Sequence, residues 1–191
     1  MVGAPKKTAT LTDYLAIPEE DRHHEILDGE LVQKTQPTAR HGNAQLKLGV
    51  ALDPFNRRGG GPPERPGGWW IFAEVDILLD GAPLRPDVTG WRRDRVPELT
   101  DDLFVRAPPD WICEVLSTSN PTRDRVRKKR IYHRHRIAHY WIVDPAETTL
   151  TVYRWQSEGY LELLIAERSD VVRAEPFDAI EIRVGTLFGD D

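Results

Sequence analysis

The stretch Trp111-Ile112-Cys113-Glu114-Val115-Leu116 decides the fold, because it is an apolar run interrupted by a single acid. Such a run is typical of a central strand that is covered on both faces. The sequence then predicts a helix from Asp124 to Arg136 and a further strand at Tyr140 to Val143, which Asp144-Pro145 ends. The order strand, helix, strand predicts a layered domain built around a sheet.

The remaining elements are predicted from turn residues and apolar spacing. A capping box at Thr10 indicates a short helix, and Asp28-Gly29 indicates a hairpin over His24 to Lys34. Apolar residues from Ala44 to Phe55 lie on one face of a second helix. We further expect a loop at 59–68, one long strand at 69–79, a strand at 86–91, a hairpin pairing 149–155 with 160–165, and a strand with a turn at 179–188.

These elements predict an α/β or α+β fold with a mixed central sheet flanked by helices. Residues 1–9 have the composition of a flexible tail, and residues 10–191 are predicted to form a single domain.

The composition excludes several classes of protein. The chain has 191 residues, of which 39% are hydrophobic and 30% charged, as in globular proteins. No apolar run approaches the roughly 18 residues of a membrane span, and residues 1–7 lack the apolar segment of a signal peptide. The single cysteine, Cys113, rules out an internal disulfide framework and a cysteine-based zinc site. We therefore expect a cytoplasmic protein without membrane partners.

The net charge of −5 hides an asymmetry. Between Asn120 and Tyr140 there are eight Lys or Arg residues and one acid, so this segment carries +7 and the rest of the chain −12. Nucleic-acid binding requires a local basic face rather than a basic total. The composition therefore permits a phosphate-binding surface.

Two acids lie in or beside apolar strands, where burying a carboxylate costs free energy unless a partner compensates its charge. Glu114 lies inside the predicted buried strand, and Asp87 opens the strand after Pro86. Glu74, in the preceding strand, could join them. A hard divalent cation would relieve their repulsion, which predicts a magnesium or manganese site. Alternatively, Glu114 pairs with an arginine and Glu74 faces solvent.

The basic segment supplies candidate partners for these acids. Asp124, Lys128 and Tyr132 share one helix face, so Lys128 could return over the strand end toward Glu114. There an ammonium group could steady an attacking water or a phosphoryl charge. The alternative is a solvated helix. The phosphate-contact candidates are Arg123, Arg125, Arg127, Lys129 and Arg130.

The motifs together resemble the Uma2 (DUF820) family, which is placed among the restriction-endonuclease-like PD-(D/E)XK nucleases. The resemblance runs from about Leu11 to Arg183. The residues that carry it are Glu25-Ile26-Leu27-Asp28-Gly29-Glu30-Leu31, His41, Glu74, Pro86-Asp87, Glu114-Val115-Leu116-Ser117, Arg123-Asp124, Lys128, Tyr132, Tyr140-Trp141, Asp144-Pro145 and Val152-Tyr153-Arg154.

The resemblance implies a restriction-endonuclease-like core with the active site at one end of the sheet. It makes Asp87 and Glu114 the metal-binding acids, with Glu74 and Glu25 as further candidates. The usual lysine position holds Leu116, and Lys128 matches the helix lysine that takes its place. Lys129 is the neighbouring alternative, but it points about 100° away on a helix.

The predicted activity is Mg²⁺- or Mn²⁺-dependent hydrolysis of DNA phosphodiester bonds. Asp87, Glu114 and the backbone carbonyl of Val115 are the expected metal ligands, and Lys128 is the expected catalytic amine. One alternative is a non-catalytic nucleic-acid- or protein-binding domain on the same scaffold, and another is a hydrolase of small phosphoesters. Analogy with nucleases that pair two sites also predicts a homodimer.

Overall fold

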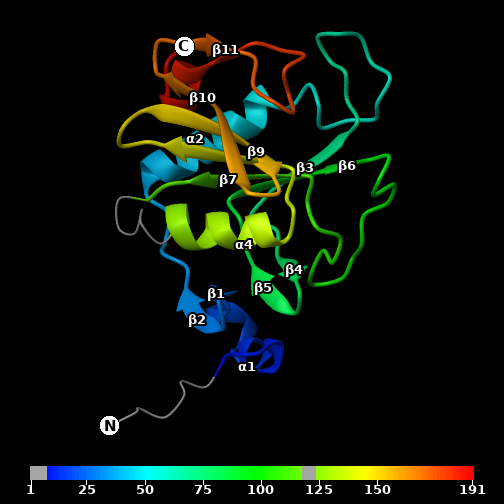
Figure 1. The fold of residues 1–191 in the computed structure, drawn as a ribbon, viewed down its shortest axis with the longest axis vertical. Helices are drawn as coiled ribbons and strands as arrows, with labels where there is room; N and C mark the ends of the chain where they lie inside the picture. Colours follow the sequence, from blue (N-terminus) through cyan, green and yellow to red (C-terminus); the bar gives the residue numbers. More distant parts are fainter. Residues whose placement is uncertain (1–7, 118–123) are drawn as a thin grey trace.

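The computed structural model describes residues 8–117 and 124–191, and its centre is a six-stranded mixed sheet (Figure 1). The strand order is β10-β9-β8-β7-β6-β3, in which β7 and β8 are parallel and all other neighbours antiparallel. The bounds are β3 Trp69–Ala73, β6 Val88–Arg92, β7 Trp111–Val115, β8 His139–Asp144, β9 Thr149–Gln156 and β10 Gly159–Glu167. The predicted mixed sheet and the predicted central strand, β7, are confirmed.

The alternation of side chains along β7 gives its two faces different neighbours. The odd-numbered residues, with Cys113 at the centre, pack in a cluster that includes helix α2 (Ala39–Ala51). Ile112 packs on the other face in a cluster with Ile131 of helix α4 (Lys129–Arg134). Glu114 falls on this second face, and its carboxylate therefore points toward α4.

The two longer helices of the prediction form, and the one from Asp124 has an irregular start. The Thr38 side chain accepts a hydrogen bond from the His41 N–H and caps α2, whose buried face carries His41, Ala44 and Leu48. The helix predicted over Asp124 to Arg136 begins as a π-helical turn, η2 (Asp124–Lys128), and continues as α4. Lys128 is therefore the last residue of the irregular turn.

The N-terminal segment also folds as predicted. Helix α1 (Leu11–Leu15) carries the expected capping box, and a short turn of 3-10 helix, η1 (Glu19–Asp21), follows. Strands β1 (His24–Leu27) and β2 (Glu30–Gln33) form the hairpin, with Asp28 and Gly29 at φ 50° and 76° as a type I′ turn requires. The hairpin places the strand that carries Glu25 beside strand β5 (Ala82–Leu84).

The prediction of one long strand over Trp69–Leu79 is wrong. Strand β3 ends at Ala73, and Glu74 adopts φ 57°, a left-handed conformation that breaks an extended strand. The chain then forms a separate hairpin from β4 (Ile77–Leu79) and β5 (Ala82–Leu84), joined by the predicted Asp80-Gly81 turn. The break directs Glu74 toward the end of the sheet where Asp87 lies.

The C-terminal part closes the face of the sheet that α2 covers. The predicted hairpin is present as β9 and β10, and the small strands β11 (Val171–Val172) and β12 (Ile182–Arg183) pair beyond it. A 3-10 helix, η3 (Val184–Phe188), ends the fold and lies against α2. Among the described residues, no helix has the length and apolar character needed to cross a membrane.

Candidate active site at the carboxyl end of β7

Glu114 is a buried carboxylate held by two side chains of the basic helix, which is the name we give to η2 and α4 together. Its Oε2 lies 3.0 Å from Lys128 Nζ, and the Tyr132 hydroxyl donates a hydrogen bond of 2.5 Å to its Oε1. The Glu114 residue is 1% exposed and Lys128 2%. Burial, assisted by the nearby Asp87 charge, raises the pKa of Glu114 well above its ordinary value, although Lys128 opposes this shift.

Asp87 lies beside it, at the start of β6. Its Oδ2 accepts a 2.7 Å hydrogen bond from the backbone N–H of Val115 and lies 3.2 Å from Nε2 of His41. Its Oδ1 lies 2.9 Å from Lys34 Nζ. Burial alone would raise the pKa of Asp87, but Lys34 and the hydrogen bond with His41 outweigh it, so the pKa falls below its usual range.

The two carboxylates open on one small cavity of about 40 Å³. Its lining includes Asp87, Glu114, Val115 and Lys128, which are the four residues that the sequence predicts as the catalytic and metal-binding core. A single water needs at least about 10–15 Å³, so the cavity has room for a small ion or a few waters. The structure therefore brings the predicted core residues together around one small cavity.

The donor chemistry of this cavity fits a hard divalent cation. Two carboxylates, with the Val115 carbonyl as a candidate third donor, form an all-oxygen set of the kind that Mg²⁺ and Mn²⁺ prefer. In the described part of the chain, Asp87 Oδ1 is buried without a hydrogen bond of good geometry, although it forms the ion pair with Lys34. Four carboxylates (Glu25, Glu74, Asp87 and Glu114) surround two ammonium groups, so the cluster has a formal excess of two negative charges.

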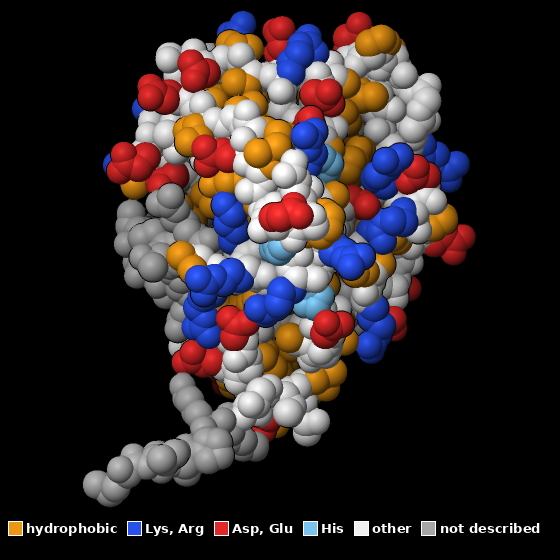
Figure 2. Space-filling view, in the orientation of Figure 1, with side chains coloured by type: hydrophobic (Ala, Val, Ile, Leu, Met, Phe, Trp, Pro, Cys, Tyr) orange, Lys and Arg blue, Asp and Glu red, His pale blue; other side chains and the backbone are white. Residues whose placement is uncertain are grey.

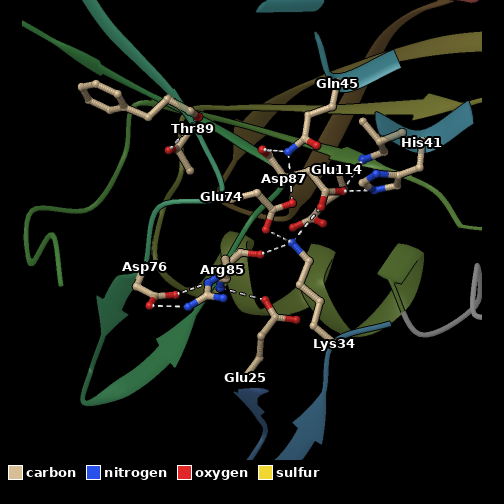
Figure 3. A network of polar contacts seen from close by, with 12 residues as sticks. Glu25, Lys34, His41, Gln45, Glu74, Asp76, Arg85, Asp87, Thr89 and Glu114 are labelled. Carbon is tan, nitrogen blue, oxygen red and sulfur yellow. Dashed lines mark hydrogen bonds and ion pairs between the residues drawn. The ribbon is translucent and has the colours of Figure 1, made fainter. Parts of the chain in front are cut away.

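The two further acids of the prediction each pair with a lysine of the site, and Figure 3 shows Glu74 beside the Lys34 ammonium. Glu25 Oε1 lies 3.1 Å from Lys128 Nζ and accepts a hydrogen bond from the Arg85 N–H. Glu74 Oε2 lies 2.7 Å from Lys34 Nζ, and its Oε1 accepts a hydrogen bond from Gln45. No group of three His, Cys, Asp or Glu suited to a metal occurs among residues 8–117 and 124–191. Glu25 and Glu74 thus lie next to Asp87 and Glu114 through shared ammonium groups.

Lys128 and its neighbour Lys129 point in different directions, as their helical spacing requires. Lys128 reaches Glu114 and Glu25, whereas the Lys129 ammonium lies 3.5 Å from the centre of the Tyr153 ring. Lys129 therefore lies on the side of the helix away from the carboxylates. Of the two predicted candidates for the amine, the geometry favours Lys128.

The predicted phosphate contacts have different surroundings. Lys129 and Arg130 line an open groove of about 740 Å³ beside β9 and β10, and Figure 2 shows Lys and Arg side chains over this helix. Arg127 instead pairs with the hairpin, since it donates a 2.7 Å hydrogen bond to the Leu27 carbonyl and lies 3.2 Å from Glu30. Arg123 and the side chain of Arg125 lie outside the described residues.

Four polar residues of the cluster were missed as site residues by the sequence reasoning: Lys34, His41, Gln45 and Tyr132. Tyr132 had a signal, because it shares the helix face of Lys128. His41 also had one, since it precedes Ala44 and Leu48 at helical spacing and a histidine is unusual on an apolar face. Lys34 and Gln45 reach the site only through tertiary contacts, which no local pattern predicts.

Comparisons with known proteins identify the family and support the fold. The family model of Uma2, described as "Putative restriction endonuclease", matches residues 11–185. Among solved structures, the chain is similar to a "putative nuclease belonging to DUF820" from Anabaena variabilis ATCC 29413. The two share 23% sequence identity with a TM-score of 0.74, and the match covers 94% of this chain and 97% of that one. No curated protein matches the chain.

The solved structure supports the fold, and the family model spans nearly the whole of the chain, including every acid and lysine of the cluster. This chain belongs to the Uma2 family of restriction-endonuclease-like proteins.

Proposed function

We propose that the chain is a metal-dependent endonuclease that hydrolyses phosphodiester bonds of DNA. The observation that carries this proposal is the meeting of Asp87, Glu114 and Lys128 around one small cavity. These groups come from β6, β7 and the basic helix, and each is less than 3% exposed. Buried charges at this density are costly, and a reaction that uses them explains why they are kept.

Asp87, Glu114 and the Val115 carbonyl are the groups that would hold Mg²⁺ or Mn²⁺. When bound, such an ion lowers the pKa of water and polarises a phosphate. The protein fixes the two acids in advance: the Val115 N–H orients Asp87, and the Tyr132 hydroxyl orients Glu114. Neither carboxylate then needs to reorganise when substrate arrives.

Lys128 is the proposed catalytic amine. Its ammonium lies between Glu114 and Glu25 at 3.0 and 3.1 Å, at the wall of the cavity. From there it can orient an attacking water and stabilise negative charge on the phosphoryl group. Lys129 and Arg130, with Arg123 and Arg125, are the proposed contacts to the DNA backbone, which makes binding sensitive to salt.

The test is cleavage of plasmid and single-stranded DNA during titration with Mg²⁺ or Mn²⁺. We expect cleavage by the wild type and a loss of about 100-fold or more in Asp87→Ala, Glu114→Ala and Lys128→Ala. Lys47→Ala is the control, because it removes a lysine of α2 that lines neither the cavity of the carboxylates nor the groove beside β9 and β10. Equal low activity in all variants would indicate a contaminating nuclease and end the proposal.

A non-catalytic DNA-binding domain is the second candidate. It is favoured by one observation: both carboxylates already have an ammonium partner within 3.0 Å, so the protein can neutralise them without a metal. DNA binding that is indifferent to metal, without cleavage, would support this function. A cytoplasmic location and a homodimer stay predictions.

A further inference from the structure

The cluster contains a second lysine, Lys34, that the proposed mechanism leaves without a role. It follows β2 directly, and its ammonium lies 2.7 Å from Glu74 Oε2, 2.9 Å from the Arg85 carbonyl oxygen and 2.9 Å from Asp87 Oδ1 (Figure 3). The Lys34 ammonium donates hydrogen bonds to Glu74 and to the Arg85 carbonyl, whereas its contact with Asp87 Oδ1 is an ion pair without hydrogen-bond geometry. The position of the charge is therefore fixed.

Lys34 lies where two cavities adjoin. It lines the 40 Å³ cavity of the carboxylates and also a second cavity of about 260 Å³, whose lining includes Gln45 and Glu74. Its side chain is 18% exposed, whereas that of Lys128 is 3% exposed. An anion that enters the larger cavity can therefore meet Lys34 directly, but it meets Lys128 only inside the smaller one.

Each of the two lysines pairs with a different acid of the carboxylate pair. Lys128 approaches Glu114 from the basic helix, and Lys34 approaches Asp87 from the N-terminal hairpin. In a phosphoryl transfer the attacking and leaving oxygens lie roughly in line, on opposite sides of phosphorus. Two cations held against different members of the pair can act on different sides of one phosphate.

We propose that Lys34 is a second phosphate-binding residue of this site, which contacts the scissile phosphate of DNA from the Asp87 side. This inference rests on the proposed function. In the reaction, a water molecule gives up one proton to solvent and its oxygen bonds to phosphorus, the bond from phosphorus to one sugar oxygen breaks, and the leaving oxygen takes a proton from solvent. Lys34 keeps its proton throughout and stabilises the negative charge of the phosphate.

The test compares Lys34→Met with Lys47→Met, a control lysine on α2, in the full-length chain. Mn²⁺ affinity is measured by calorimetry on metal-free protein. The affinity for duplex DNA is measured at several salt concentrations in the presence of Ca²⁺, and gels verify that the DNA stays intact. Without the Lys34 charge we expect Mn²⁺ to bind at least about fivefold more tightly, because Val115 and His41 still hold Asp87.

Two further results are expected from Lys34→Met. The slope of log affinity against log salt falls in magnitude by about 0.9, the value for one lost phosphate contact. Cleavage in Mg²⁺ loses about 100-fold in kcat, as for removal of one charge-stabilising group. Lys34→Arg keeps the charge and restores the slope, and Lys47→Met matches the wild type throughout.

A lysine that merely holds Asp87 in place gives a different pattern. Lys34→Met would then bind Mn²⁺ no more tightly than the wild type and would keep the salt slope, and this result overturns the inference. If the wild type cleaves no DNA but Lys34→Met shows both the tighter Mn²⁺ binding and the smaller slope, the endonuclease proposal fails while Lys34 stands as a phosphate-binding residue.

Discussion

Asp87 and Glu114 line the same cavity, yet their pKa values shift in opposite directions. Asp87 is stabilised as an anion by Lys34 and by hydrogen bonds from its neighbours. Burial raises the pKa of Glu114, and the Lys128 ammonium opposes this rise. The opposite pKa shifts arise from the different residues around each acid. The two acids therefore contribute differently to the pH dependence of the free energy of unfolding.

Asp87 should stabilise the fold most at neutral pH. Its folded pKa is below its unfolded value near 3.8, so the unfolded chain binds more protons and the stabilisation is lost as the pH falls below about 4. Asp87→Asn should therefore lose stability relative to the wild type at pH 7, and the difference should shrink toward pH 3. Urea unfolding of both proteins in EDTA at several pH values measures this stability difference. A difference that does not change with pH would contradict the prediction.

Tyr132 should contribute to stability through its bond to Glu114. Tyr132→Phe removes a 2.5 Å hydrogen bond to a buried carboxylate, which should lower the free energy of unfolding by about 1.5–3 kcal/mol. Tyr160→Phe is the matched control, since the Tyr160 hydroxyl donates to the neutral Ile137 carbonyl and should cost about 0.5–1.5 kcal/mol. Equal losses in urea unfolding would show that the carboxylate gives the bond no additional strength.

At the scale of the element, the sequence correctly predicted those helices and turns that depend on neighbouring residues. The Asp28-Gly29 turn, the capped α1 and the apolar face of α2 each depend on residues within a few positions of one another. The strand at 69–79 failed because its break depends on Glu74, whose left-handed backbone accompanies contacts with Lys34 and Gln45 from distant segments. Alternation alone could not reveal that break.

The N-terminal hairpin should depend on Arg127 for its attachment to the basic helix. Arg127 donates to the Leu27 carbonyl at 2.7 Å and lies 3.2 Å from Glu30. Arg127→Met should lower stability by about 1 kcal/mol and speed hydrogen exchange of the amides in β1 and β2. Arg130→Met, which changes an exposed arginine of the same helix, should leave both unchanged. Exchange that is no faster in the first variant than in the second would refute this attachment.

At the scale of the whole molecule, the cluster draws on segments that span more than half of the chain. Glu25 and Lys34 come from the N-terminal hairpin, Asp87 and Glu114 from the sheet, and Lys128 from the basic helix. The sequence identified three of these by the cost of buried acids and by family resemblance, and it named Glu25 as a further candidate. Lys34 was missed because a lysine after a hairpin is ordinary until the fold places it against Asp87.

The excess negative charge of this cluster makes the stability of the whole fold sensitive to divalent cations. Four carboxylates against two ammonium groups repel one another, and a cation that binds only the folded state relieves that repulsion. At a free Mn²⁺ concentration of about 100 times its dissociation constant, the free energy of unfolding should rise by about 2.7 kcal/mol. EDTA should reverse the effect, and NaCl at equal ionic strength should not reproduce it. Asp87→Asn should abolish it, and an undiminished gain in that variant would place the bound cation elsewhere on the molecule.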